Sequence, residues 1–182
     1  MSKAIGLVEY KTIPKGIEAA DGMLKASEVQ LLFSSPICPG KYVSVICGEV
    51  DAVRTAVNRA VAIGDLFTID SHVIPNVHPS VIPAITATVE VTKVEALGVV
   101  ETISAIAAIK AGDVAAKAAG VRLVEIRIAR GLGGKGFVLF TGDLGSVETS
   151  VRACEKELGD EGGVVSSSVI PSPHRDLISY VM

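Results

Sequence analysis

Cys38 is the residue in this sequence whose type and setting are best suited to chemistry. It lies in Ser35-Pro36-Ile37-Cys38-Pro39-Gly40-Lys41, between the apolar runs Val29–Phe33 and Tyr42–Cys47. Proline fixes φ and removes a backbone donor, so the two prolines predict a stiff turn and exclude strand interior. The sequence therefore predicts a thiol that is presented at the tip of a loop.

A thiol at a loop tip can bind a metal, but a single Cys38 cannot hold an iron–sulfur cubane, which normally takes four thiolates. Assembly with three-fold symmetry removes this objection, because a loop near the axis would bring three Cys38 thiolates together. The fourth iron would then carry a solvent or exogenous ligand. The other interpretation is an exposed thiol without any ligand, and the residues alone leave both interpretations open.

A second motif, Gly131-x-Gly133-x-x-Gly136, has the spelling of a dinucleotide-binding fingerprint. That fingerprint requires a helix after the glycines, whereas Phe137-Val138-Leu139-Phe140 reads as a strand. Gly134-Lys135 is followed by Gly136 and not by Ser or Thr, which also argues against a phosphate-binding loop. We therefore do not expect a nucleotide site here.

The remaining histidines and cysteines do not have metal-ligand spacing. The chain has three histidines, His72, His78 and His174, and the last two follow proline-containing turns. Because the motifs with metal-ligand spacing are missing, a structural hydrogen bond is favoured over metal binding for His78 and His174. Cys47 ends an apolar strand and Cys154 sits in a predicted helix, where free cysteine is commonly buried and inert.

The chain carries two tandem copies of one pattern. Ala4-Ile5-Gly6-Leu7-Val8-Glu9 recurs as Ala96-Leu97-Gly98-Val99-Val100-Glu101, at an offset of 92 residues (98 − 6). Val73-Ile74-Pro75-Asn76-Val77-His78 recurs as Val169-Ile170-Pro171-Ser172-Pro173-His174, at an offset of 96 (169 − 73). The drift indicates small insertions in the loops of the second copy. We expect one domain at residues 1–92 and a second at 93–182.

The repeat also pairs residues with chemical potential. Asp21 and Lys25 recur as Asp113 and Lys117 at the offset of 92, each pair one helical turn apart. Such pairs are either solvated helix pairs or a repeated lattice contact. The segment Gly133-Gly134-Lys135 aligns with the Cys38 turn, because Gly134-Lys135 corresponds to Gly40-Lys41.

Each copy is predicted to fold as β-α-β-β-α-β. The first copy has strands at Ala4–Tyr10, Val29–Phe33, Tyr42–Cys47 and Phe67–Ile74, helices at Ile17–Ser27 and Asp51–Ile63, and a short last helix at Pro79–Thr88. The second has strands at Ala96–Glu101, Val121–Ala129, Phe137–Thr141 and Val164–Ile170, and helices at Ala105–Ala119 and Ser146–Leu158. The predicted fold class is α+β: two tandem ferredoxin-like domains, with antiparallel sheets and helices on one face.

The composition narrows the class of protein. The 182 residues are 49% hydrophobic and carry a net charge of −3, which argues against a nucleic-acid-binding surface. Met1-Ser2-Lys3 leads directly into a strand pattern, so no secretory signal is predicted. A membrane span is not expected either. Three cysteines without paired spacing favour a reducing compartment, and a cytoplasmic protein is expected.

With the duplication and these motifs, the chain closely resembles the bacterial microcompartment shell family. The resemblance covers nearly the whole length and is carried by the first-strand motif, the helix motif Glu18-Ala19-Ala20-Asp21-Gly22-Met23-Leu24-Lys25-Ala26 and the strand-end motif of residues 73–78. Two fused copies look like the tandem-domain branch, whose members form trimers that imitate hexamers. The resemblance therefore implies a homotrimer that joins other shell proteins in a hexagonal sheet.

The resemblance also implies roles for individual residues. The Cys38 segment is similar to the pore loop of tandem members from propanediol-utilisation compartments, where the matching cysteine binds a [4Fe-4S] cluster on the trimer axis. Lys25 and Lys117 match the edge lysine through which tiles meet. Asn76 and Ser172 stand where many single-domain members carry an arginine, so the resemblance implies no tile contact through an arginine at that position. The expected pore loop comprises Ile37, Pro39, Gly40, Lys41, Gly133, Gly134 and Lys135.

These inferences predict a shell tile and not an enzyme, because no general base or nucleophile can be identified. Three Cys38 side chains would hold one [4Fe-4S] cluster at a central pore, for electron transfer or cluster transport across the shell. An encapsulated or cytosolic redox protein is a further expected partner. Two alternatives stay open: a tile whose Cys38 lines a metabolite pore without a cluster, and a small-molecule sensor.

Overall fold

The computed structural model describes residues 4–91, 93–128, 131–160 and 162–181. The chain forms two compact units, one of Met1–Val77 with Ala129–Gly134 and one of His78–Ile128 with Lys135–Met182. The segment after Val77 thus folds with the second unit, although the repeat assigns it to the first copy. The predicted domain boundary at residues 92 and 93 stays a prediction.

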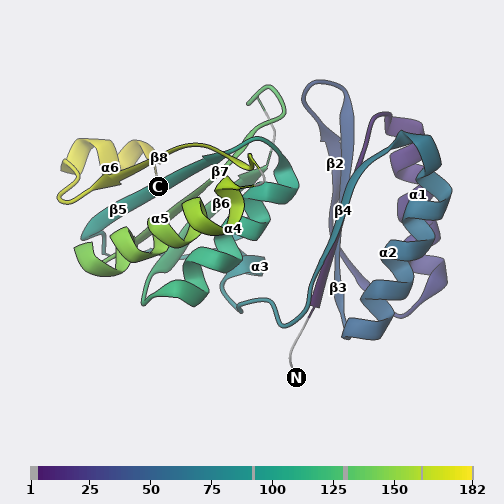
Figure 1. The fold of residues 1–182 in the computed structure, drawn as a ribbon, viewed down its shortest axis with the longest axis horizontal. Coiled ribbons are helices and arrows are strands. Elements are labelled where there is room, and N and C mark those ends of the chain that lie inside the picture. The colour runs from purple at the N-terminus through teal and green to yellow at the C-terminus, as the bar shows by residue number, and fades with distance from the viewer. Residues whose placement is uncertain (1–3, 92, 129–130, 161, 182) are drawn as a thin grey trace. The chain divides into compact units, whose positions relative to one another are not determined.

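The first unit is a four-stranded antiparallel sheet with two long helices on one face (Figure 1). Its strand order is β2-β3-β1-β4. The elements are β1 (Ala4–Tyr10), α1 (Ile13–Ala26), β2 (Gln30–Ile37), β3 (Lys41–Gly48), α2 (Val50–Gly64), the short 3-10 helix η1 (Asp65–Phe67) and β4 (Thr68–Ile74).

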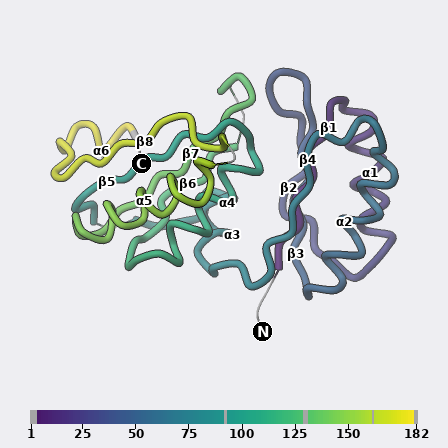
Figure 2. Tube along the Cα trace, in the orientation of Figure 1, coloured from purple at the N-terminus to yellow at the C-terminus, as the bar shows by residue number. Residues whose placement is uncertain are grey.

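The second unit repeats this plan with the strand order β6-β7-β5-β8, and its trace can be followed in Figure 2. It begins with α3 (Val81–Ile85), which packs on the sheet and helix that follow. The remaining elements are β5 (Ala96–Thr102), α4 (Ala105–Ala118), β6 (Arg122–Ile128), β7 (Gly136–Gly142), α5 (Leu144–Gly159), β8 (Val164–Ile170) and α6 (Arg175–Val181). The predicted α+β class with antiparallel sheets and helices on one face is confirmed.

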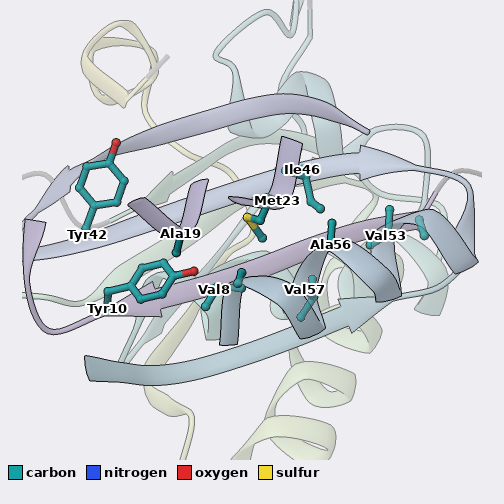
Figure 3. Packing of buried hydrophobic residues seen from close by; sticks show 11 residues of the cluster. Val8, Tyr10, Ala19, Met23, Tyr42, Ile46, Val53, Ala56 and Val57 are labelled. Atoms are coloured by element: carbon teal, nitrogen blue, oxygen red, sulfur yellow. The ribbon is translucent and has the colours of Figure 1, made fainter. Parts of the chain in front are cut away.

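The core of the first unit lies between its sheet and its helices. Alternate residues of β1, among them Val8 and Tyr10, point to the helices and pack with Met23 of α1 and Val57 of α2 (Figure 3). Gly6 lies in the same row, and a Cβ atom added there would come within 2.6 Å of the Val57 side chain. The close approach of α2 to β1 therefore requires glycine at this position.

Two local predictions were wrong, and one helix was missed. The first helix begins at Ile13 and not at Ile17, because Pro14 occupies the first turn, where a missing N–H costs nothing. Pro36 was excluded from strand interior, yet it lies within β2 and pairs with Tyr42. β2 is an edge strand, and its outer side tolerates a residue without a backbone donor. The helix α6 was not predicted at all.

No helix among the described residues is both long and apolar enough to cross a membrane.

Candidate functional site

Cys38 lies at the tip of the hairpin that joins β2 to β3. Ile37 and Lys41 form the last pair of the hairpin, and Cys38-Pro39-Gly40 makes the turn, with a cis peptide bond before Pro39. The N–H of Gly40 donates to the carbonyl oxygen of Ile37 at 3.0 Å, and Gly40 has a φ of +91°, which favours glycine. Ile37 is buried while Cys38 is half-buried and Pro39 is exposed, so a fixed turn presents the thiol.

The lysine that follows each turn is held by a carboxylate on the neighbouring strand. Lys41 Nζ lies 2.7 Å from Glu9 Oε1, and Lys135 Nζ lies 2.9 Å from Glu101 Oε1. The hydrogen bond from Lys135 lowers the pKa of Glu101. The two lysines expected in the pore loop are thus neutralised by ion pairs.

Glu9 and Glu101 were missed as functional residues. Glu9 is fully buried, and its Oε2 has no hydrogen-bond partner among the described residues. A signal for this role was present in the sequence, because the repeated first-strand motif ends in glutamate in both copies. Both carboxylates anchor the base of a turn, and neither belongs to its tip.

The second copy's turn is built from glycine. Gly131, Gly133 and Gly134 all have positive φ values, of +72°, +61° and +94°. Gly134 is buried, and a Cβ atom there would lie 3.3 Å from the carbonyl oxygen of Cys38. The predicted loops therefore meet at the backbone of Cys38, where only glycine fits without a shift. A strand, β7, follows these glycines, so the context of a dinucleotide site is missing.

The other two thiols are buried. Cys47 is buried in β3. Cys154 is buried in α5, where its Sγ donates to the carbonyl oxygen of Ala111 at 3.3 Å, and burial raises its pKa to about 12. Of the three thiols, only that of Cys38 is accessible to a ligand in the chain as described.

The two predicted tile-edge lysines differ in their surroundings. Lys25 pairs with Asp21 at 2.6 Å, and both side chains are exposed. Lys117 also pairs at 2.6 Å with Asp113, but that carboxylate is buried. The same helical pair is therefore solvated in the first unit and part of the core in the second.

The histidines make local contacts. His78 Nδ1 lies 2.8 Å from Ser80 Oγ, and His174 Nδ1 accepts from the N–H of Asp176 at 3.3 Å. Asn76, in the strand-end motif, has a φ of +57°, a conformation that asparagine tolerates better than most residues. Ser172 is exposed at the matching position.

The part of the chain that the structure describes was compared with the ligand sets that metal sites require. Among the described residues, no group of three or more His, Cys, Asp or Glu side chains is arranged to hold a metal ion.

A separate cavity of about 410 Å³ lies on the open face of the second unit's sheet. Its walls are mainly apolar, and the ion pair between Arg127 and Glu125 lies at its edge, with Arg127 Nε 2.7 Å from Glu125 Oε1. The apolar lining comes from Leu97, Val99, Phe137, Leu139, Ile170, Leu177 and Tyr180.

The two copies match a known domain. The profile of the BMC domain matches residues 4–77 and again residues 96–173. The chain is 43% identical over 177 residues to the bacterial microcompartment shell protein PduT of Citrobacter freundii, which covers 97% of this chain and 96% of that protein. It is also similar to the shell protein PduA of the same organism, with 40% identity over 43% of this chain and 87% of PduA. PduA therefore spans about one copy.

A solved structure has the same fold over the whole length. A microcompartment protein from Desulfitobacterium hafniense DCB superimposes with a TM-score of 0.94 at 48% sequence identity, covering 98% of this chain and 99% of that one.

Proposed function

We propose a specific task for this chain, which belongs to the BMC-domain family of bacterial microcompartment shell proteins. Three copies form a pseudohexameric tile, and three Cys38 thiolates hold one [4Fe-4S] cluster at the central pore. The task is electron transfer, or transport of the cluster, across the shell. The observation that carries this proposal is the single accessible thiol at the tip of the β2–β3 hairpin.

The shell location and the structural role follow from sequence similarity to known shell proteins. PduT and PduA are shell proteins, so the predicted shell protein without enzymatic activity is confirmed. The trimer is our proposal, and it is supported by the duplication, since three chains of two copies supply six domains. The tile joins other shell proteins in a hexagonal sheet, and exposed Lys25 suits an edge contact better than Lys117 does.

The residues present fit a cubane cluster only in the trimer. One chain offers one thiol, and three-fold symmetry supplies three of the four ligands, which leaves one iron for a solvent or exogenous ligand. When bound, such a cluster supplies one-electron chemistry. The chain's own part is to hold the thiol: buried Ile37 and the hydrogen bond from Gly40 fix the turn, and the Lys41–Glu9 pair fixes its base.

Iron and sulfide analysis of protein purified without oxygen tests the cluster. Wild type is expected to contain roughly 1.3 iron atoms per chain, four shared by three chains, and to absorb in the visible range. Cys38→Ser is expected to be colourless and free of iron. Cys154→Ala is the matched control, because it also leaves two cysteines and removes a thiol that is buried. Equal iron content in wild type and Cys38→Ser would overturn the cluster.

One alternative keeps the tile and drops the cluster, so that Cys38 lines a metabolite pore. Its expected outcome is a trimer that stays colourless after anaerobic reconstitution with iron and sulfide.

The sensor alternative has one observation in its favour, the apolar cavity on the open face of the second sheet. If the protein is a sensor, a ligand bound in this cavity should raise its melting temperature. The overexpressed protein should then form no sheets or tubes.

A further inference from the structure

The carboxylate of Glu9 is held through only one of its two oxygens. Glu9 lies in β1, between β3 and β4, and its side chain is fully buried. Lys41 Nζ of β3 lies 2.7 Å from Oε1, whereas Oε2 accepts no hydrogen bond from the described residues. A buried carboxylate oxygen needs a donor or a cation in place of its water, so Oε2 is a ligand oxygen whose partner has to be identified.

The second copy shows how the same carboxylate is satisfied. Glu101 is the equivalent of Glu9, and Lys135 pairs with its Oε1 at 2.9 Å. Its Oε2 accepts a hydrogen bond from Ser166 Oγ of β8 at 3.3 Å. Ser166 is the residue directly opposite Glu101 in the antiparallel pair of β5 with β8. The second oxygen of this carboxylate thus faces the last strand of its sheet.

In the first copy the residue opposite the glutamate is an aspartate. Asp70 of β4 pairs with Glu9 as Ser166 pairs with Glu101. Side chains that are directly opposite in an antiparallel pair lie on one face, with their Cβ atoms about 5 Å apart. Asp70 is exposed, and its Oδ1 accepts from the N–H of Ser71 at 2.7 Å, while no contact among the described residues engages Oδ2. An acceptor therefore stands where the second copy has a donor.

We propose that Glu9 Oε2 and Asp70 Oδ2 bind a small divalent cation of the Mg²⁺ class, which takes the place of the Ser166 hydroxyl. Hard cations prefer carboxylate oxygens, and Mg²⁺ is commonly held by one or two carboxylates while waters complete its shell. The charges agree, because Lys41 balances only one of the two carboxylates. The exposed side of Asp70 gives the waters access. This site depends neither on the cluster nor on the trimer.

Binding of Mn²⁺ tests the site, because Mn²⁺ takes the same oxygen ligands and the free ion is counted by electron paramagnetic resonance. The experiment uses the Cys38→Ser background, which removes the accessible thiol. This chain is expected to bind about one Mn²⁺ ion at concentrations on the order of 1 mM, and Mg²⁺ in excess should displace it. Adding Asp70→Ser, which installs the residue of the second copy, should abolish the binding.

The matched control is Asp51→Ser in the same background. It also removes an exposed carboxylate, but from the first turn of α2, and it should keep the bound ion. Equal binding of Mn²⁺ with and without Asp70→Ser would overturn the inference. A chain with intact Glu9 and Asp70 that binds no Mn²⁺ would overturn it as well.

Thermal unfolding separates a bound cation from a purely structural role of Asp70. Mg²⁺ is expected to raise the melting temperature of the chain with Asp70 and to leave that of the Asp70→Ser chain unchanged. In EDTA the Asp70→Ser chain should melt no lower than its parent, because the introduced serine can donate to Glu9 as Ser166 donates to Glu101. An equal rise in both chains, or a lower melting temperature of Asp70→Ser in EDTA, would overturn the inference.

Discussion

The two copies of the domain differ most at the hairpin turn between their second and third strands. In the first copy this turn is Cys38-Pro39-Gly40, and in the second it contains Gly131, Gly133 and Gly134 with positive φ values. The base of both turns is the same, a lysine paired with a glutamate on the neighbouring strand. The two copies thus share the anchor, while one tip carries a thiol and the other is a glycine backbone that packs closely on Cys38.

The thiols give the sharpest test of this difference. On iron-free native protein at pH 8, iodoacetamide is expected to modify one cysteine per chain, Cys38, and all three only after denaturation. Cys154 is protected because burial raises its pKa to about 12, so almost no thiolate forms. Mass spectrometry counts the adducts, and rapid modification of two or three thiols in the native chain would contradict the assignment.

The two anchors are expected to differ in strength. Lys41→Met leaves the fully buried carboxylate of Glu9 without its cation, which should lower the free energy of unfolding by about 3 kcal/mol. Lys135→Met leaves no buried charge unpaired, because Glu101 is partly solvated. This substitution should lower the free energy of unfolding by at most about 1 kcal/mol. Urea denaturation of both variants measures the difference. Equal losses would show that the two anchors are equivalent.

The glycines of the two turns should also respond unequally to alanine. Gly40→Ala meets no atom within 4 Å and is penalised only for its φ of +91°, by about 1 kcal/mol. Gly134→Ala has the same backbone penalty and also places its Cβ 3.3 Å from the Cys38 carbonyl oxygen, so about 2 kcal/mol is expected. The same denaturation experiment compares them, and a smaller loss for Gly134→Ala would contradict the close packing.

The smallest expected effect is a pH dependence at the second anchor. The pKa of Glu101 in the folded chain lies below its ordinary value of 4.5, so the unfolded chain binds more protons in the window between the two values. The stabilisation is present above pH 4.5 and is lost as the pH falls through the folded pKa. The difference in unfolding free energy between wild type and Lys135→Met should therefore shrink below pH 4.5. A difference in unfolding free energy that grows on acidification would contradict the lowered pKa of Glu101.

The fold could be predicted well because both copies carry the same sequence pattern. β8 runs from Val164 to Ile170 in prediction and structure alike, and β1 likewise matches at both ends. The errors lie where local rules compete with tertiary context. Pro36 forbids the middle of a sheet but not its edge, and only the strand order shows that β2 is an edge.

The candidate site was predicted in part. The position of Cys38 at a tip follows from its neighbours in the sequence, whereas the anchor by Glu9 depends on a pairing across the sheet, Glu9 with Val43 next to the turn's base. The sequence also could not predict that Asp113 is buried while Asp21 is exposed. Both residues form an i,i+4 pair with a lysine, but they differ in what packs on them.

Pro36 has a consequence for contacts between copies of this chain. The outer edge of β2 lacks one backbone donor close to the turn, so a strand from another molecule cannot form a continuous hydrogen-bonded ladder there. Extension of the sheet across this part of the edge is therefore disfavoured. An edge interrupted in this way protects the chain against amyloid-like strand pairing.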